Sequence, residues 1–265
     1  MSLKNDIVKQ YDRNKNWSEK DRDVAKQSEL ARALVNKCKI KLLQKVTSLC
    51  SIESVLDLCC GRGPDIPKYL SFNMERYIGT DISIGALKEA RARFDQIKAK
   101  KAVSFKYFTL VQADLTAVNL KLKAQVDLAI IHLAIHYLVD HTEHLFKTLR
   151  NCLLKNGLII VSFLDKQVIT SKDLKLPDYV TIKHIDENYY EYSFDGFLHK
   201  IQERYVSKMD LLVLFQSNGF TLVEQGPFEI LISEESVANK IMTETAAAMD
   251  KSLTGLMSFF IFKYS

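Results

Sequence analysis

The sequence predicts an α/β fold in which a mostly parallel sheet is covered by helices on both faces. Short apolar runs alternate with amphipathic segments from about residue 54 to residue 163, a pattern typical of parallel strands joined by crossover helices. The run Leu158–Phe163 is apolar almost throughout, as in a strand buried on both faces. The 265 residues, 47% of them hydrophobic, are enough to build one full core.

The first half of the chain divides into an arm and a series of alternating elements. Residues 1–30 are strongly polar and are expected to form an N-terminal arm, and residues 31–265 a single domain. Apolar residues at helical spacing predict a helix from about Ser28 to Leu49. The elements expected next are strands at Ser54–Cys59, Arg76–Thr80, Val103–Gln112, Val126–Ile131 and Leu158–Phe163, and helices at Pro64–Leu70, Ile84–Ile97 and His141–Leu154, the last ending at Asn156-Gly157.

The last third of the chain has a different pattern. Strand-like segments follow one another without helices between them, which predicts a small antiparallel insertion at about residues 175–207. Its strands are expected at Val180–Ile185, Tyr189–Phe194 and Leu198–Glu203. After the insertion we expect a helix at Lys208–Ser217, a strand at Phe220–Gln225, a helix at Glu234–Met249 and a final strand at Leu256–Lys263.

Composition limits the classes of function. The net charge of +5 is a small indication of a polyanionic partner. The five Cys are odd in number and form no C-x-x-C pair, so we expect reduced thiols, no disulfide framework and no bound metal. The N-terminus lacks an apolar signal segment, and no apolar run approaches the roughly 18 residues of a membrane span. An intracellular, reducing location without a membrane partner is therefore expected.

Acidic residues lie at the ends of three successive predicted strands: Asp57, Asp81 and Asp114. A glycine-containing turn, Gly61-Arg62-Gly63, follows the first of them and allows backbone to approach a ligand at the carboxyl ends of the strands. The turn lacks the G-x-G-x-x-G spacing of a dinucleotide loop. Each Asp by itself could simply cap a helix. The series in this order suits a nucleoside with a positive charge and no phosphate, which favours S-adenosyl-L-methionine over NAD.

Several motifs occur in a distinctive order. Residues 55–65, VLDLCCGRGPD, are similar to V-L-D-L-G-C-G-K-G-G-D; residues 32–39, RALVNKCK, to R-x-x-N-N-x-x-K; and residues 132–137, HLAIHY, to Q-F-x-x-H-Y. Glu203-Arg-Tyr205 is similar to a downstream motif E-Y, and Tyr11-Asp12 is similar to a motif Y-N in an N-terminal arm. Together they resemble the mRNA cap guanine-N7 methyltransferases, including those of large-DNA-virus capping enzymes. These are class I Rossmann-like methyltransferases, whose seven-stranded sheet has an antiparallel last strand.

The sequence departs from the family pattern at a few positions. Cys59 replaces a Gly, Val35 replaces an Asn and His132 replaces a Gln. Leu256 and Met257 are the residues nearest to a cap-contacting Tyr that the family tends to have near its C-terminus. We expect these changes to rearrange cap contacts.

The resemblance implies the roles of individual residues. It implies binding of S-adenosyl-L-methionine, with S-adenosyl-L-homocysteine as product, by Lys39, Asp57, Gly61, Asp65, Asp81, Ile82, Asp114, Leu115, His132 and Leu133. It implies contacts with capped RNA by Asn36, Arg62, Arg93, His136, Tyr137 and Glu203. No side chain is expected to act as acid or base, because guanine N7 carries no proton. His136, Tyr137 and Glu203 would instead align the reacting atoms.

Two other functions remain open from the sequence. One is a class I methyltransferase for a small molecule or a protein. The other is a catalytically silent fold that only binds RNA or a subunit. For the main hypothesis the expected partners are the capped 5′ end of RNA and, beyond it, triphosphatase or guanylyltransferase domains of the same capping enzyme or a stimulatory subunit. The expected location is the nucleus for a cellular enzyme, and a cytoplasmic replication site or the virion for a viral one.

Overall fold

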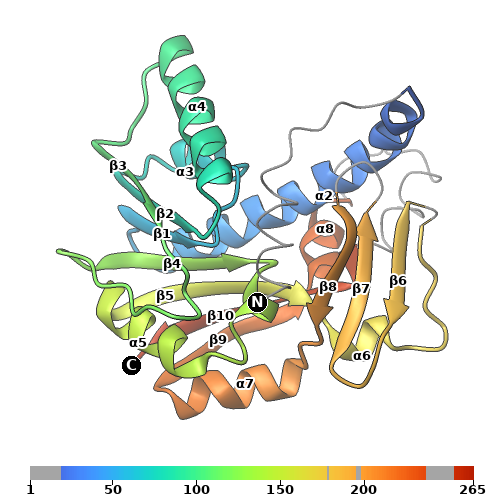
Figure 1. Ribbon diagram of the computed structural model, residues 1–265. Helices are drawn as coiled ribbons and strands as arrows, with labels where there is room; N and C mark the ends of the chain where they lie inside the picture. Colours follow the sequence, from blue (N-terminus) through green and yellow to red (C-terminus); the bar gives the residue numbers. More distant parts are fainter. Residues whose placement is uncertain (1–18, 178, 195–197, 237–253) are drawn as a thin grey trace.

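The computed structural model describes residues 19–177, 179–194, 198–236 and 254–265 (Figure 1). Its main sheet has seven strands in the order β3-β2-β1-β4-β5-β10-β9. β10 is antiparallel to both of its neighbours, while the pairs among β1 to β5 are parallel. The predicted sheet with an antiparallel last strand is confirmed. The bounds are β1 Ser54–Leu58, β2 Arg76–Asp81, β3 Tyr107–Gln112, β4 Val126–His132, β5 Leu153–Leu164, β9 Phe220–Pro227 and β10 Met257–Tyr264.

Helices cover both faces of this sheet, as predicted. Neighbouring residues of β1 point to opposite faces: Val55 packs into one core cluster and Leu56 into the other. The first cluster includes residues of α2, α3, α4 and α8, and the second includes residues of α5 and α7. The bounds are α2 Glu19–Leu49, α3 Ile66–Ser71, α4 Ile84–Lys100, α5 Thr142–Cys152, α7 Lys208–Ser217 and α8 Phe228–Ser236, with the short helices η1 at Ile135–Tyr137 and α6 at Lys166–Ile169.

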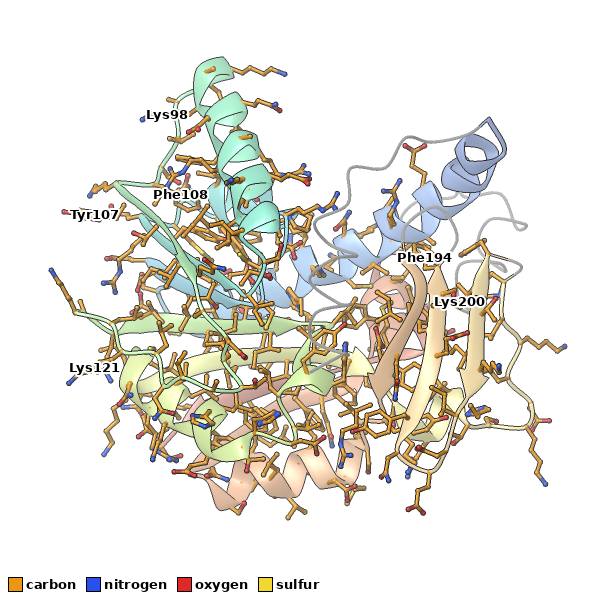
Figure 2. The ribbon with its side chains drawn as sticks, viewed as in Figure 1. Lys98, Tyr107, Phe108, Lys121, Phe194 and Lys200 are labelled. Atoms are coloured by element: carbon orange, nitrogen blue, oxygen red, sulfur yellow. The ribbon has the colours of Figure 1, made fainter. Side chains whose placement is uncertain are left out.

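The edge strand β3 illustrates how side chains alternate on this sheet. Tyr107 is exposed at its start, whereas Phe108 lies against α4 and stacks on Phe94 with ring centroids 3.8 Å apart. Figure 2 shows Tyr107 pointing away from the molecule and Phe108 toward the helix. The strand begins at Tyr107 rather than at the predicted Val103. Before it, the Ser104 hydroxyl donates to the carbonyl of Met74, and the Lys106 N–H donates to the carbonyl of Glu75, without a regular strand ladder at Ser104.

The predicted antiparallel insertion is confirmed as a separate three-stranded sheet of β6, β7 and β8. In its register Tyr190 lies opposite both His184 and Glu203. A bridge between Asp165 and Val206 connects it to the chain that leaves β5. In Figure 1 the small sheet stands beside the carboxyl end of β5. The bounds are β6 Val180–His184, β7 Tyr189–Phe194 and β8 Leu198–Arg204.

Several predicted boundaries were wrong. α2 begins at Glu19, before the predicted Ser28, so part of the expected arm is helical. Asn156-Gly157 does not end a helix: α5 ends at Cys152, and Asn156 lies inside β5 with φ of 66°. The register against β4 shifts there, and asparagine tolerates the left-handed conformation that such a bulge needs.

The predicted helix Glu234–Met249 falls mostly outside the described residues. The part that is described belongs to α8, which begins earlier, at Phe228. Residues 1–18 of the expected arm also lie outside the described ranges. All five cysteines are free thiols. Within the described ranges, none of the helices combines the length and the apolar character that crossing a membrane requires.

Candidate active site

The predicted ligand site lies at the point in the sheet where the strand order reverses, between β1 and β4. β1 is flanked by β2 on one side and β4 on the other, and such a switch point opens a crevice at the carboxyl ends of the strands. The turn after β1 contains Gly63 with φ of 65°. A Cβ at Gly63 would lie 2.4 Å from Cδ1 of Ile66 and 3.0 Å from Cβ of Ala90. Only glycine therefore lets this turn pack against α3 and α4.

Cys59 begins the same turn in a conformation that favours glycine. Its φ is 59°, in the left-handed region where an L side chain costs roughly 1–2 kcal/mol. The resembling family has Gly at this position, which gives the departure a physical meaning. The side chain is half-buried. Burial first, and then the charges of Asp81, Asp57 and Asp114, raise the pKa of the Cys59 thiol. The carboxyl groups at all three predicted strand ends thus influence the same thiol, that of Cys59.

Asp81 connects the end of β2 to the turn after β1. Its Oδ2 accepts from the backbone N–H of Gly61 at 2.8 Å, and its Oδ1 accepts from that of Ser83 at 2.9 Å. Both oxygens are therefore held in fixed positions at the carboxyl end of β2. Ile82, the next residue, is half-buried.

Asp114 is held by its own turn. Its Oδ1 accepts from the backbone N–H of Thr116 at 3.0 Å and from the Thr116 hydroxyl at 2.6 Å. Leu115 beside it is buried. A polar acceptor next to an apolar side chain is the arrangement expected for an adenine site.

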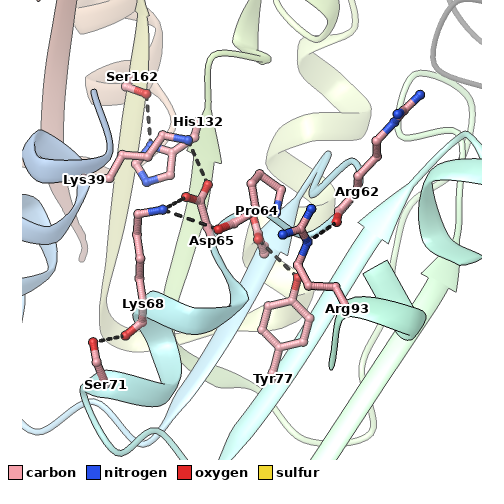
Figure 3. Close-up of polar contacts among 11 residues, drawn as sticks. Lys39, Arg62, Pro64, Asp65, Lys68, Ser71, Tyr77, Arg93, His132 and Ser162 are labelled. Carbon is pink, nitrogen blue, oxygen red and sulfur yellow. Dashed lines mark hydrogen bonds and ion pairs between the residues drawn. The ribbon is translucent and has the colours of Figure 1, made fainter. Parts of the chain in front are cut away.

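A buried charge cluster lies beside the turn after β1 (Figure 3). Lys39 of α2 donates to Oδ2 of Asp65 at 2.8 Å, and Lys68 of α3 donates to Oδ1 at 2.6 Å. Burial alone would raise the pKa of Asp65, but the surrounding positive charge, foremost that of Lys39, lowers it below its usual range. Asp65 is therefore ionised and bound on both oxygens.

His132 and Leu133 complete this cluster at the end of β4. Nδ1 of His132 lies 3.0 Å from the Ser162 hydroxyl. Burial, and then the charge of Lys39, lower the pKa of His132 to about 3, so the imidazole is neutral at pH 7. Leu133 has φ of 53°, and its N–H donates to the carbonyl of Ser162 at 2.9 Å.

Asp57 lies beneath the cluster, inside β1, and is only 3% exposed. Burial first, and then the charge of Asp65, raise the pKa of Asp57 to about 7. The Tyr77 hydroxyl donates to Asp57 at 3.2 Å. Gly79 faces Asp57 across the strands, and a Cβ there would lie 2.6 Å from the Tyr77 hydroxyl. The absence of a side chain at Gly79 is therefore what lets Tyr77 reach the carboxyl group.

Three of the predicted cap residues meet between η1 and β8. His136 and Tyr137 contact edge to face, with ring centroids 3.9 Å apart. Nε2 of His136 lies 3.6 Å from Oε1 of Glu203, beyond hydrogen-bond distance, and it is buried without a hydrogen-bond partner in the described structure. Burial lowers the pKa of His136 although Glu203 opposes the shift. Buried polar atoms are normally paired, so this nitrogen is an exception among the described residues.

The other predicted cap residues lie farther out. Arg62 and Arg93 are brought together, because Nε of Arg93 donates to the carbonyl of Arg62 at 3.2 Å. Arg62 also lies 3.3 Å from Glu89 in an ion pair. Asn36 is exposed on α2.

The structure adds residues that sequence reasoning missed. Lys68 follows Asp65 by three positions in the first turn of α3, a helical spacing that could have indicated the pair. Tyr190 donates to Oε2 of Glu203 at 2.6 Å. Finding Tyr190 required the register of β7 against β8, which the sequence does not fix. Ser162, the partner of His132, lies on a strand predicted only as apolar.

Solved structures share this architecture. The chain superposes on a S-adenosylmethionine-dependent methyltransferase from Clostridium acetobutylicum with TM-score 0.58 and 15% identity, covering 94% of this chain and 100% of that one. It superposes on the glycopeptide N-methyltransferase MtfA complexed with S-adenosyl-L-methionine with TM-score 0.56 and 16% identity, covering 86% and 93%. At these identities the likeness establishes the Rossmann-like methyltransferase fold.

Curated relatives match a short stretch. An mRNA cap guanine-N(7) methyltransferase of Debaryomyces hansenii is 46% identical over 46 residues, 17% of this chain and 9% of that protein. The enzyme of the same name from Candida albicans is 45% identical over 47 residues, 18% of this chain and 10% of that protein. The matched stretch thus spans about a tenth of the length of these relatives.

A family profile covers far more of the chain. The profile described as mRNA (guanine-N(7))-methyltransferase domain matches residues 2–213. This range includes the glycine-containing turn, the charge cluster around Asp65, and the pair of His136 with Glu203. The chain therefore belongs to the mRNA (guanine-N(7))-methyltransferase domain family.

Proposed function

We propose that this chain transfers a methyl group from S-adenosyl-L-methionine to N7 of the guanine of GpppN-RNA, the last step of cap 0 formation. The observation that carries the proposal is the pair of His136 and Glu203. Both side chains are buried, one nitrogen of His136 lacks a partner in the described structure, and Tyr137 adjoins them. A purine with donors and acceptors on its edge would satisfy these groups.

The residues of the crevice fit S-adenosyl-L-methionine. The carboxylates of Asp81 and Asp114, and that of Asp57 where it is ionised, act on the thiol of Cys59, and this negative charge suits a ligand with a positive sulfonium. Lys39, which pairs with Asp65, suits the carboxylate of the methionine part. When bound, the cofactor supplies a methyl group on a sulfur that is a good leaving group, so no side chain has to generate an electrophile.

Glu203 is suited to hold guanine. A carboxylate accepts from N1–H and the 2-amino group of guanine together, in two charge-assisted hydrogen bonds. Tyr190 fixes Oε2 of Glu203 and thereby the orientation of the whole group. Tyr137 offers an aromatic surface for a base. As guanine gains positive charge, the preorganised Glu203 carboxylate stabilises it.

The reaction needs no general base from the chain. Guanine N7 presents a lone pair without a proton, so these side chains have only to orient the base and exclude water. Alignment of this kind contributes up to about 7–11 kcal/mol to lowering a barrier.

The RNA and the partners extend this proposal. Arg62 and Arg93, held together by the bond between them, are suited to the triphosphate bridge because a guanidinium matches phosphate geometry. We infer that triphosphatase and guanylyltransferase steps come from other domains of the same enzyme or from other proteins, and that a stimulatory subunit is a further partner. The site of action would be the nucleus for a cellular enzyme, and a cytoplasmic replication site or the virion for a viral one.

The decisive experiment supplies methyl-labelled S-adenosyl-L-methionine with three matched RNAs: GpppG-capped, ApppG-capped and uncapped. We expect label only in the GpppG-capped RNA, recovered as 7-methylguanosine after digestion. Label in the uncapped RNA or in protein would favour a methyltransferase with another substrate. Binding of S-adenosyl-L-homocysteine without any transfer would favour the silent fold.

A further inference from the structure

The groups proposed to hold guanine come from two different sheets. His136 and Tyr137 lie on η1, which follows β4 of the main sheet, whereas Glu203 lies on β8 of the small sheet. The 3.6 Å between Nε2 of His136 and Oε1 of Glu203 therefore depends on how β8 is held against the chain around η1. A misplacement of about 1 Å between reacting groups can lower a rate roughly a hundredfold.

An ion pair joins the same two segments. Nε of Arg204 lies 3.0 Å from Oδ1 of Asp140. Arg204 follows Glu203 directly, and Asp140 lies three residues after Tyr137. The end of β8 therefore meets the η1 segment at two points, through the buried Glu203 and through the partly exposed Arg204.

The backbone around Asp140 ties this residue to His136. The Val139 N–H donates to the carbonyl of Ile135 at 3.0 Å, a bond that spans His136 and ends next to Asp140. On β8 the two partners of these contacts are consecutive residues. A change in the spacing at the ion pair is therefore passed on to the buried pair beside it.

A backbone link restrains the chain after β8 on another side. The Lys166 N–H donates to the carbonyl of Val206 at 2.9 Å, next to the bridge between Asp165 and Val206. These contacts connect the small sheet to the chain that leaves β5, while the ion pair connects it to the chain that leaves β4. The two links together restrain β8 across the proposed guanine site.

We propose that Arg204 and Asp140 are positioning residues: their ion pair sets the separation of Glu203 from His136 and thereby the width of the guanine site. The inference rests on the proposed function, because it takes guanine as the ligand between these groups. The side chains of the pair are 31% and 45% exposed, and such pairs contribute little to stability. Loss of the pair should therefore affect cap recognition more than folding.

A direct role of Arg204 in binding RNA phosphates predicts a different result for Asp140. A carboxylate beside a phosphate-binding arginine repels the polyanion, so Asp140→Asn would then leave the reaction with RNA unchanged or improve it. If the pair positions the guanine site, Asp140→Asn should instead impair the reaction, as Arg204→Gln does.

Steady-state kinetics of a double-mutant cycle separates these roles. For Arg204→Gln, Asp140→Asn and the double variant, we expect kcat/KM for GpppG-RNA to fall about fivefold, the upper end for an exposed ion pair. The double variant should be no worse than either single variant, because both changes remove the same contact. Arg204→Lys keeps the charge and should recover most of the activity. The Kd for S-adenosyl-L-homocysteine should stay unchanged throughout, which also shows that each variant is folded.

Lys106→Gln is the matched control, because it removes an exposed ion pair with Glu75 before β3, and it should change neither quantity. If Arg204→Gln does not fold, Asp140→Asn and Arg204→Lys still decide the question. Unchanged kcat/KM in the single variants, additive losses in the double variant, or a gain in Asp140→Asn would overturn the positioning role while leaving the proposed function intact. Failure of the unaltered protein to methylate GpppG-RNA would contradict the proposed function itself.

Discussion

The Tyr190 hydroxyl donates a 2.6 Å hydrogen bond to Oε2 of Glu203, and both side chains are buried. The two residues face each other across β7 and β8. Burial first, and then the charge of Glu203, raise the pKa of Tyr190, so the proton stays on the tyrosine. One oxygen of Glu203 is therefore fixed by the fold, and the other is turned toward His136.

Removing this hydroxyl tests whether it positions Glu203 for guanine. Tyr190→Phe deletes a hydrogen bond to a buried carboxylate, which is worth about 1.5–3 kcal/mol. We expect the KM for GpppG-RNA to rise about tenfold or more while the Kd for S-adenosyl-L-homocysteine stays unchanged. Tyr107→Phe, at an exposed site on β3, is the control. A lower affinity of Tyr190→Phe for S-adenosyl-L-homocysteine would show that Tyr190 supports cofactor binding, and it would contradict the proposed role in guanine recognition.

Paired variants test the division of the site into two halves. Asp81→Ala removes the acceptor for the N–H groups of Gly61 and Ser83, and it should mainly weaken cofactor binding. Glu203→Ala should weaken cap binding and turnover with cofactor affinity nearly intact. Calorimetry with S-adenosyl-L-homocysteine and steady-state kinetics with capped RNA measure the two effects. Loss of cofactor binding alone in Glu203→Ala would contradict this division.

Cys59→Gly should stabilise the protein. The left-handed backbone at Cys59 costs roughly 1–2 kcal/mol for an L residue, and the greater freedom of glycine in the unfolded chain offsets about 0.5–1 kcal/mol of that gain. Urea unfolding should therefore show a gain of up to about 1.5 kcal/mol. Gly61→Ala is the mirror experiment: its φ is 52° with no atom within 4 Å of an added Cβ, so it should lose stability through strain alone. A Cys59→Gly variant as unstable as Gly61→Ala would show that packing of the thiol outweighs strain.

The stability of the protein should depend on Asp57 as pH rises. In the folded state the pKa of Asp57 is about 7 against an ordinary 3.8, so between these values the folded protein binds more protons than the unfolded chain. Stability is therefore lost as pH rises through this window. The charges that face Asp57 are the carboxylate of Asp65, which raises its pKa, and the ammonium of Lys39, which lowers it.

Asp57→Asn removes this dependence. Its stability relative to the unaltered protein should increase from pH 4 to pH 7 by at most about 4 kcal/mol, from the linkage of the pKa shift, and remain level above. Urea unfolding at a series of pH values measures the difference, with Asp95→Asn, at an exposed position on α4, as the control. A difference that does not vary with pH would mean that Asp57 titrates alike in both states.

Much of the fold could be predicted because local patterns of apolar residues indicate which segments are buried. The apolar run Leu158–Phe163 could hardly be anything but a central strand, and the alternation before it fixed the sheet. The boundaries failed where tertiary contacts decide: Ser104 is held by Met74 instead of by a ladder, and Asn156 lies in a bulge instead of at a helix end. Both depend on partners distant in the sequence.

The candidate site could be outlined from the sequence where its motifs are contiguous, but not where its residues are far apart in the chain. Asp57 and Asp65 flank the glycine-containing turn in the sequence, and Asp81 ends the neighbouring strand, so their grouping follows from the local motif and the strand order. Tyr190 and Ser162 act through cross-strand register and inter-strand contact, which no local pattern encodes. In the sequence, Cys59 is only a departure from the family motif. Its positive φ in the structure shows that the backbone there is strained for a residue with a side chain.

In the proposed site, the small sheet supplies one ligand contact that the main sheet does not, and this would let part of the base recognition evolve separately from cofactor binding. The groups around the expected nucleoside come from α2, α3 and the ends of strands in the main sheet, whereas Glu203 comes from the small sheet. Substitutions in β7 or β8 can accumulate without altering the charges around Asp65. Selection could thus change the accepted base, or relax its recognition, in a lineage whose use of the methyl donor stays constant.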